Sequence, residues 1–456
     1  MDEPLADSTR KTSSSASNVY AWLEWIAWGF AFISLILYVG FATNGFWGDD
    51  WALRAQAVRG ASLVDPISSH LRPMARAFFG LLRWTDSPVA FHSISILLHL
   101  LTAVAVYSLT TVLYGAQIGR LAALGFFTAF QANEAVYWAS SVSVILCLLF
   151  SLLALRAWAV GRPRIAAALL VPAALSYELW LAAIPLLFLI RRGRIRDWIL
   201  LGAVFGAFVV TYLWTIGSGG ATSYGGWKWV AIPERLATYA YHLFAPTSGS
   251  VGVIVALVVL GTLVAAATWV PTLRIPVTLY LSSATVLALA ETQVMVSRFS
   301  YFPQLALVLM FLLMKDIGRI GRWIGAGLMT YVLVVSPFWN FIDGRDYRDL
   351  AAFEATVAAS TQSALADAKP GDSFGFLNQT TPAPLIELIQ SFRGRPKTAF
   401  VRGAALHGAV YLPDAVTLEL HGRDLAAEEN HTCSGRRFEF GNGAPVSRYC
   451  FNVIAK

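Results

Sequence analysis

Two adjacent carboxylates, Asp49 and Asp50, follow the first long hydrophobic segment of the chain. A carboxylate pair beside a membrane face is costly unless water, a cation or a substrate meets it there. Basic side chains come next in the sequence, at His70, Arg72, Arg76, Arg83, His92 and His99. Acids and bases at one membrane boundary predict chemistry on a phosphorylated, lipid-borne substrate. The alternative is a solvated loop whose acids only flank the end of a helix.

Composition predicts the elements that must hold these side chains. Of 456 residues, 57% are hydrophobic and 13% are charged, with 16 tryptophans, and the mean hydropathy is +0.59. Soluble domains do not have this balance. A spanning helix needs about 20 mostly apolar residues, and such runs recur up to Ile342. The sequence therefore predicts a polytopic α-helical membrane protein. The net charge of +7 is no sign of nucleic-acid binding, because the arginines cluster in short loops between apolar runs.

Eleven membrane spans are predicted. They are 19–42, 89–113, 119–135, 138–156, 164–177, 179–190, 198–216, 251–270, 276–296, 300–314 and 323–342. The first is too long for a signal-peptide core, so we expect it to be retained. The fifth and sixth are short, and the alternative is one long helix broken around Tyr177.

Basic residues predict the orientation of the spans. With a cytoplasmic amino terminus, the arginine-rich loops lie in the cytoplasm, as the positive-inside rule requires. Splitting the fifth and sixth spans also puts the loop with Arg191, Arg192, Arg194 and Arg196 on that side. The same orientation places Asp49, Asp50, Glu134, Glu178 and Arg298 on the outer face. We expect a multi-pass protein of a cytoplasmic (inner) membrane, with a bacterial cell envelope as the easiest context.

Three regions are predicted along the chain. Residues 1–18 form a disordered cytoplasmic tail, residues 19–345 form the transmembrane module with external loops 43–88 and 217–250, and residues 346–456 form a soluble α/β domain outside the membrane. In that domain we predict helices at 350–368 and 384–392, and strands at 373–377, 398–401, 416–420, 437–440 and 448–454. Within the first external loop, Leu53 and Ala57 are one helical turn apart and predict a short helix on the membrane surface.

The three cysteines support an external carboxy-terminal domain. An oxidising compartment would let Cys433 and Cys450 form a disulfide that staples the last strands. Two buried free thiols are the alternative. Cys147 lies within a predicted span and is expected to pack there as an ordinary apolar side chain.

Short motifs recur in a particular order along residues 45–345. They are Asp49-Asp50-Trp51, Arg72-Pro73, Phe91-His92, Leu98-His99-Leu100, Asn133-Glu134 with Tyr137-Trp138, Ser176-Tyr177-Glu178 and Arg298-Phe299-Ser300-Tyr301. This order resembles that of the GT-C superfamily of membrane glycosyltransferases, above all the branch with protein O-mannosyltransferases. Tyr177 stands where that branch has lysine, and Phe299 where tyrosine is usual, so the substrate is not carried over.

The resemblance implies a polyprenyl-phosphate-linked sugar donor and an acceptor outside the membrane, which is a glycan, a lipid-linked saccharide or a protein. A base must take a proton from the acceptor hydroxyl as it attacks the anomeric carbon. We assign this to Asp50, with Asp49 positioning the acceptor or tuning Asp50, although either acid could be the base. The enzyme would be a hexosyl- or pentosyltransferase.

The leaving lipid phosphate needs positive charge, and the guanidinium fork suits it. We assign Arg298 first, with Arg72 and His70 as helpers; an interfacial arginine that reaches toward the headgroups is the alternative for Arg298. Residues expected to contact the acceptor or line its pocket are Glu134, Glu178, Trp51 and His92. For the two glutamates, a position at a helix end without any function is the alternative.

A metal-independent reaction is preferred, although the clustered carboxylates could hold Mg²⁺ or Mn²⁺. His92 and His99 lie two helical turns apart, about 10 Å, which is too far for one metal ion. They are expected to be hydrogen-bonded structural histidines.

Two other classes of protein remain open. A transporter or flippase for a lipid-linked glycan would need polar groups at mid-membrane, where the predicted spans carry few ionisable residues besides His99. A non-catalytic envelope scaffold would tolerate the loss of Asp50. No phosphate-binding loop of the Walker type is present, which makes ATP-driven transport a poor fit.

Overall fold

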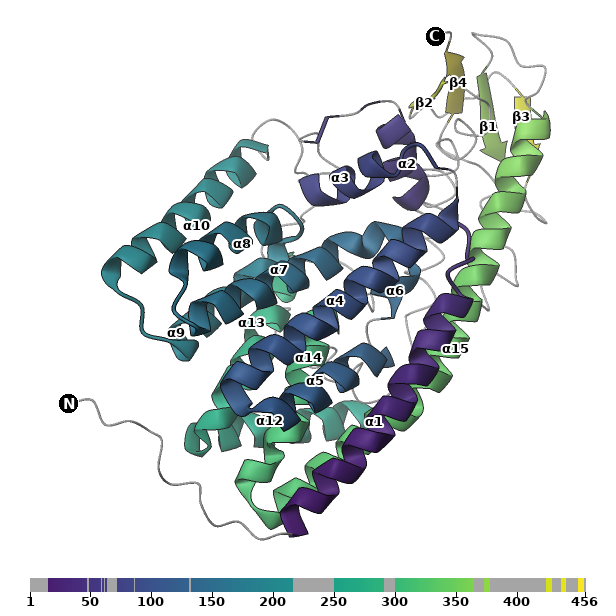
Figure 1. Ribbon diagram of the computed structural model, residues 1–456. Helices are drawn as coiled ribbons and strands as arrows, with labels where there is room; N and C mark the ends of the chain where they lie inside the picture. Colours follow the sequence, from purple (N-terminus) through teal and green to yellow (C-terminus); the bar gives the residue numbers. More distant parts are fainter. Residues whose placement is uncertain are drawn as a thin grey trace.

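The computed structural model describes residues 15–46, 49–58, 60, 62–63, 72–85, 87–130, 133–215, 250–290, 300–364, 373–377, 424–428, 436–439 and 450–454. Helices make up most of this part of the chain (Figure 1). The α-helices are α1 (Ser15–Gly40), α2 (Asp49–Val58), α3 (Pro73–Leu81), α4 (Pro88–Tyr114), α5 (Ala116–Thr128), α6 (Glu134–Tyr137), α7 (Val142–Ala159), α8 (Pro163–Ala174), α9 (Ile184–Ile190), α10 (Ile195–Thr215), α12 (Ser250–Trp269), α13 (Arg274–Ala290), α14 (Tyr301–Leu313) and α15 (Arg319–Ala364). Short 3₁₀ helices are η2 (Ala139–Ser141), η3 (Glu178–Ala183), η6 (Pro271–Leu273) and η8 (Met314–Ile317).

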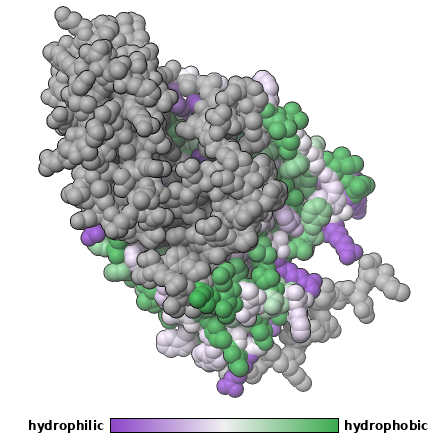
Figure 2. Space-filling view, turned by 180° about the vertical axis from the view of Figure 1, so that it is seen from behind, coloured by the Kyte–Doolittle hydropathy of each residue, from purple (hydrophilic) through white to green (hydrophobic). Residues whose placement is uncertain are grey.

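Four of these helical segments are long and apolar enough to cross a membrane. They are Val19–Gly40, Pro88–Tyr114, Ala139–Ala159 and Arg319–Arg345. Many large apolar side chains of α1, α4, α10 and α15 are exposed, and hydrophobic residues cover much of the described surface seen from behind (Figure 2). The protein is therefore a helical membrane protein. Helices also lie over part of each of the other seven segments that the sequence analysis marked as spans, and whether those cross the membrane stays a prediction.

The segment with two alternatives forms a helical hairpin rather than one broken helix. Helix α8 ends at Ala174, Tyr177 is extended (φ −166°, ψ 148°), and η3 with α9 carries the chain back. Directly after α9, Arg191 O accepts a hydrogen bond of 3.3 Å from the indole N–H of Trp158, which lies at the end of α7. Arg191 therefore lies beside the turn that begins α8, so both ends of the hairpin are on one side.

Helices α4 and α7 pack together and run in the same direction, so their starts mark one end of the bundle and their last residues mark the other. Near its start, His92 of α4 contacts Gly45 O at 3.4 Å. The residue two positions before α7, Ser140, donates its backbone N–H to Asp50. We call this end of the molecule the Asp50 end. The 18 residues of α7 then carry the chain about 27 Å away.

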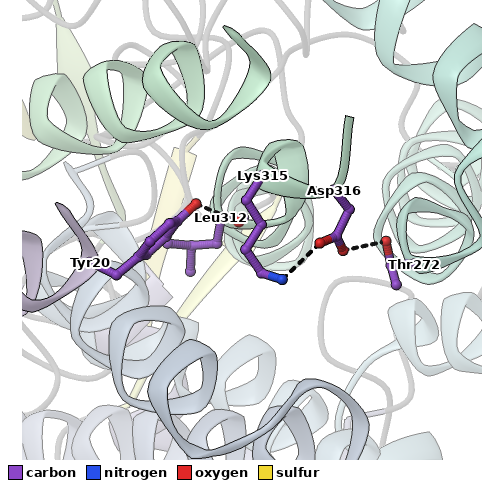
Figure 3. Close-up of polar contacts among 5 residues, drawn as sticks. All are labelled: Tyr20, Thr272, Leu312, Lys315 and Asp316. Atoms are coloured by element: carbon purple, nitrogen blue, oxygen red, sulfur yellow. Dashed lines mark hydrogen bonds and ion pairs between the residues drawn. The ribbon is translucent and has the colours of Figure 1, made fainter. Parts of the chain in front are cut away.

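The opposite end, which we call the arginine end, is closed by polar contacts between helix termini. The Tyr114 hydroxyl at the end of α4 donates to Thr272 O over 3.4 Å, and the Thr272 hydroxyl donates to Asp316 over 2.7 Å. Lys315 pairs with Asp316 at 2.7 Å, and the Tyr20 hydroxyl at the start of α1 donates to Leu312 O over 3.1 Å (Figure 3). These bonds join α1, α4 and η6 to the η8 turn.

Helix α14 lies at the centre, and all of its residues from Tyr301 to Leu313 are buried. A helix that is apolar on every side is expected in such a position. Its only strongly polar side chain, Gln304, donates to Phe126 O over 2.9 Å. The central helix is therefore tied to the end of α5.

Helix α5 ends inside the bundle, where its last carbonyls have no partner within the helix. Side chains from other helices bond them. Besides Gln304 from α14, Tyr38 from α1 donates to Phe127 O over 3.3 Å, and Asn340 from α15 donates to Thr128 O over 3.1 Å. His99 from α4 also contacts Phe127 O, at 3.2 Å. Four helices thus meet at one helix terminus.

Helices α1 and α15 run side by side and in the same direction (Figure 1). Gly344 allows α15 to approach the turn after α1 closely, because a Cβ there would overlap the ring of Phe41. The sequence analysis expected a span ending at 342 and a separate helix at 350–368. That expectation was wrong, because α15 is continuous over 46 residues. Gly344 lies within the helix, where it packs against Phe41, and does not terminate it.

Four short strands form one sheet in the order β2-β4-β1-β3. They are β1 (Ser373–Leu377), β2 (Asp424–Glu428), β3 (Arg436–Glu439) and β4 (Cys450–Ile454). Strand β1 pairs parallel with β3 and antiparallel with β4, which also pairs antiparallel with β2. Three of the strands coincide with segments expected to be strands; β2 was missed because it contains no β-branched or aromatic residue. The segments expected at 384–392, 398–401 and 416–420 lie outside the described residues.

Replacing Gly344 with alanine is expected to lower the free energy of unfolding by about 1–3 kcal/mol, because the added methyl group forces the turn after α1 away from α15. Gly327→Ala on the same helix is the matched control, since a Cβ there meets no atom within 4 Å. Thermal unfolding of both variants in detergent measures the difference. Equal stability of the two variants would show that the close approach at Phe41 is unimportant.

Candidate active site at the Asp50 end

Asp50 lies in the first turn of α2, and its side chain is 0% exposed. The Ser140 backbone N–H donates to its Oδ1 over 2.6 Å. That N–H is one of the donors that a helix start leaves without an intrahelical acceptor, and bonds from a backbone N–H to a carboxylate are among the strong ones. The bond fixes the Asp50 carboxylate at the start of the η2–α7 segment.

Aromatic packing holds the start of α2 in place. The ring of Trp51, which is buried, lies 5.5 Å from that of Phe46, and Phe46 lies 5.2 Å from Phe91 at the start of α4. The guanidinium carbon of Arg54 is 4.9 Å from the Phe46 ring centre. Helix α2 was expected on the membrane surface. Its Leu53 and Arg54 are instead buried within the protein.

Arg72 joins the start of α3 to the turn between α8 and η3. Its guanidinium carbon is 4.5 Å from the centre of the Tyr177 ring, a cation–π arrangement. The Met74 N–H donates to Leu175 O over 3.2 Å and fixes the same contact through the backbone. Glu178, the first residue of η3, follows directly and is half-buried.

Glu134 is the first residue of α6, a single turn, and is 3% exposed. The preceding Asn133 donates from its amide to Asn340 and Asp343 of α15, over 3.3 and 2.5 Å. The Tyr137 hydroxyl donates to Asn340 O over 3.0 Å. These bonds set the position of Glu134 relative to α15.

Burial raises the pKa of Tyr137 well above its ordinary value, and the nearby Tyr38 and Asp343 raise this pKa further. The Tyr137 hydroxyl therefore keeps its proton throughout the physiological pH range. Its bond to Asn340 O needs that proton and therefore persists over this range.

The two histidines make the hydrogen bonds that the sequence analysis expected. His92 contacts Gly45 O at 3.4 Å. His99 contacts Phe127 O at 3.2 Å through Nε2 and the Tyr301 hydroxyl at 2.6 Å through Nδ1. Because a carbonyl only accepts, Nε2 carries the proton and Nδ1 accepts from Tyr301. His99 is therefore a structural link between α4, α5 and α14.

The structure brings six of the expected site residues to the Asp50 end. They are Asp50, Trp51, Arg72, His92, Glu134 and Glu178. The side chain of Asp49, and His70, Arg298 and Cys433, lie outside what the structure describes, and of Cys450 only its place at the start of β4 is described. The expected disulfide and the roles of these residues stay predictions.

Asn340 and Asp343 were not singled out from the sequence. The two are three residues apart, which places them on one face of a helix, and both are buried. Polar residues at this spacing after a long apolar run could have indicated a buried polar site, as Asp49 and Asp50 did after the first apolar run. Asn340 and Asp343 hold the amide of Asn133.

Among the described residues, no three histidine, cysteine, aspartate or glutamate side chains lie close enough to hold a metal ion. The carboxylates that the metal alternative required include Asp49, whose side chain is not among those described. Comparison of the chain with models of known protein families and with curated proteins finds no match. The class that the described residues define is that of a helical membrane protein with three buried acids, Asp50, Glu134 and Asp343, at one end.

Asn340→Leu tests how far the Asp50 end depends on α15. The change removes the donor to Thr128 O and the acceptor for Asn133, and each buried group left unpaired costs about 1–3 kcal/mol. We expect a loss of stability of this size or more in thermal unfolding. Thr330→Val is the control, because Thr330 bonds only within its own helix. A loss no larger than that of the control would contradict the assigned network.

Proposed function

We propose that the protein is a membrane glycosyltransferase of the GT-C type. It moves one hexose or pentose from a polyprenyl phosphate to an acceptor on the outer side of a cytoplasmic membrane. The observation that carries the proposal is Asp50, a fully buried carboxylate held by a backbone N–H at one end of membrane-length helices. Burying a carboxylate is costly, and such positions in membrane proteins are functional candidates by default.

In the proposed reaction Asp50 accepts the proton of the acceptor hydroxyl. The hydroxyl oxygen forms a bond with the anomeric carbon of the sugar as the bond from that carbon to the phosphate oxygen breaks. The polyprenyl phosphate leaves with the electron pair, so the products are the glycosylated acceptor and an anionic lipid phosphate. A general base of this kind contributes about 10²–10⁴-fold.

Arg72, together with Arg298 and His70, is proposed to bind the departing phosphate. The Arg72 guanidinium carbon lies 4.5 Å from the centre of the Tyr177 ring, and a guanidinium group matches phosphate oxygens in bidentate geometry. Glu134 and Glu178, which begin helices at the same end, are proposed to contact the acceptor, with Trp51 and His92 at the wall of the pocket. The carboxy-terminal segment 346–456 is proposed to be an external domain that selects the acceptor.

Transport of a lipid-linked glycan is the second candidate, and the described spans do not favour it. Such a path needs polar groups at mid-membrane. Among the described histidine, lysine, arginine, aspartate and glutamate side chains of the four long apolar helices, the one nearest the middle of a span is His99, and both of its ring nitrogens are bonded to protein groups. Those bonds assign His99 a structural role.

Asp50→Asn is expected to reduce sugar transfer by about 10²–10⁴-fold, because the amide cannot accept the proton. Mass spectrometry of envelope glycans, from cells with matched amounts of the wild-type or variant protein, should show the loss of one hexose- or pentose-sized increment. The matched control is Asp316→Asn, a carboxylate at the arginine end, which should leave the glycans unchanged. Identical glycans in the wild type and the Asp50 variant would exclude Asp50 as the base.

Arg72→Lys keeps the charge and loses the planar fork. We expect the KM for a purified polyprenyl-phosphate sugar to rise about tenfold, the equivalent of about 1.4 kcal/mol, while kcat changes little. Arg345→Lys, an exposed arginine at the same end, is the control. A fall in kcat with no change in KM would place Arg72 outside the donor site.

A further inference from the structure

At the arginine end, a cavity of about 470 Å³ opens between the starts of α8 and α10. Three arginines line it, Arg162, Arg164 and Arg196. One carboxylate, Asp197, also lines it, accepts the Arg194 N–H over 3.1 Å and lies 3.8 Å from Arg196. The positive charge of the cavity therefore exceeds its negative charge.

The walls of the cavity are held by aromatic contacts. The indole N–H of Trp158 donates to Leu187 O over 2.9 Å, and its ring lies 5.0 Å from that of Trp198. Phe188 stacks on Trp198 at 4.1 Å with an interplanar angle of 10°. These contacts join the ends of α7 and α9 to the start of α10, so the arginines project from a fixed frame.

A fourth arginine adjoins this frame. The Nη1 atom of Arg191 is buried and has no hydrogen-bond partner among the described residues. It lies 3.1 Å from where a Cβ on Gly161 would stand, beside Arg162 in the chain. Gly161 has φ +77°, which glycine adopts without strain. Arg191 does not line the cavity itself, but its buried nitrogen lacks an acceptor in the described part of the chain, which a water molecule or an anion would supply.

Apolar side chains border the same cavity. Ile165 and Leu200 line it, and on α10 the neighbouring Ile195 and Ile199 are strongly exposed. Exposed isoleucines beside a cationic cavity offer an apolar surface that acyl chains can contact. The cavity thus combines cationic groups with an apolar rim, which matches an amphiphile better than a free anion.

We propose that this cavity binds the phosphate of an anionic phospholipid in the leaflet at the arginine end. Basic pockets between membrane helices recognise such headgroups, and guanidinium groups bind phosphate oxygens in bidentate fashion. The site is separate from Asp50, which lies about 27 Å away along α7, and it is independent of the proposed transfer reaction. Orientation by the positive-inside rule explains arginines on this side, but it requires neither a formed cavity nor a buried unbonded guanidinium.

Native mass spectrometry of the full-length protein tests the proposal, with phosphatidylglycerol as the probe and phosphatidylcholine as the neutral reference. The double variant Arg162→Gln/Arg196→Gln removes two charges from the cavity. We expect it to bind phosphatidylglycerol at least about tenfold more weakly, since each charged hydrogen bond contributes about 1.5–3 kcal/mol. Arg319→Gln/Arg322→Gln removes two charges from the same end outside the cavity and should bind as the wild type does.

Two results would overturn the proposal. An equal loss in both double variants would show that only the general charge of this end attracts the lipid. Release of the lipid by millimolar glycerol 3-phosphate would show a site for soluble phosphate. If the cavity variant does not fold, Arg164→Gln, an exposed position, replaces it, and unchanged lipid binding there would count against the site.

Discussion

The interior terminus of α5 is the constraint on which the bundle depends. Its last carbonyls lie away from water, and each needs a donor. Side chains of α1, α4, α14 and α15 supply these donors at Phe126, Phe127 and Thr128. Because one cluster of bonds joins helices from both halves of the sequence, the register of each helix is fixed relative to the others. The side chain of Asn340 also accepts from Asn133, so the same cluster extends to α6 and Glu134.

The two ends of the molecule, on either side of this cluster, carry different chemical groups. Toward the Asp50 end, α2, α3 and α6 are short helices that fold back onto the starts of α4 and α7 and carry a buried acid with them. Toward the arginine end, turns with an excess of positive charge close the bundle and form a cavity. The separation is about the length of one spanning helix, so a phosphate lipid bound at one end does not compete with a substrate bound at the other. The proposed transfer reaction and the proposed lipid site therefore lie at opposite ends of the molecule.

Much of this arrangement could be predicted from the sequence because apolar runs and charges carry the signal. The four long helices and the helical hairpin at residues 163–190 follow from run length and from the position of the arginines. The hydrogen bonds of His92 and His99 follow from the cost of burying an unpaired imidazole. The continuity of α15 through Gly344 could not be predicted, because it depends on packing against Phe41, 303 positions earlier in the chain. Likewise, the bond from Ser140 to Asp50 joins two loops, and no local pattern indicates which backbone N–H will meet which carboxylate.

The most direct test of the central claim is a structure of the protein with a polyprenyl-phosphate sugar bound. If Asp50 is the base, the phosphate lies at the Asp50 end within hydrogen-bond distance of Arg72, and the anomeric carbon is open to attack by a hydroxyl that Asp50 can deprotonate. Donor density at the arginine end, or a sugar placed where no acceptor could contact Asp50, would contradict this claim.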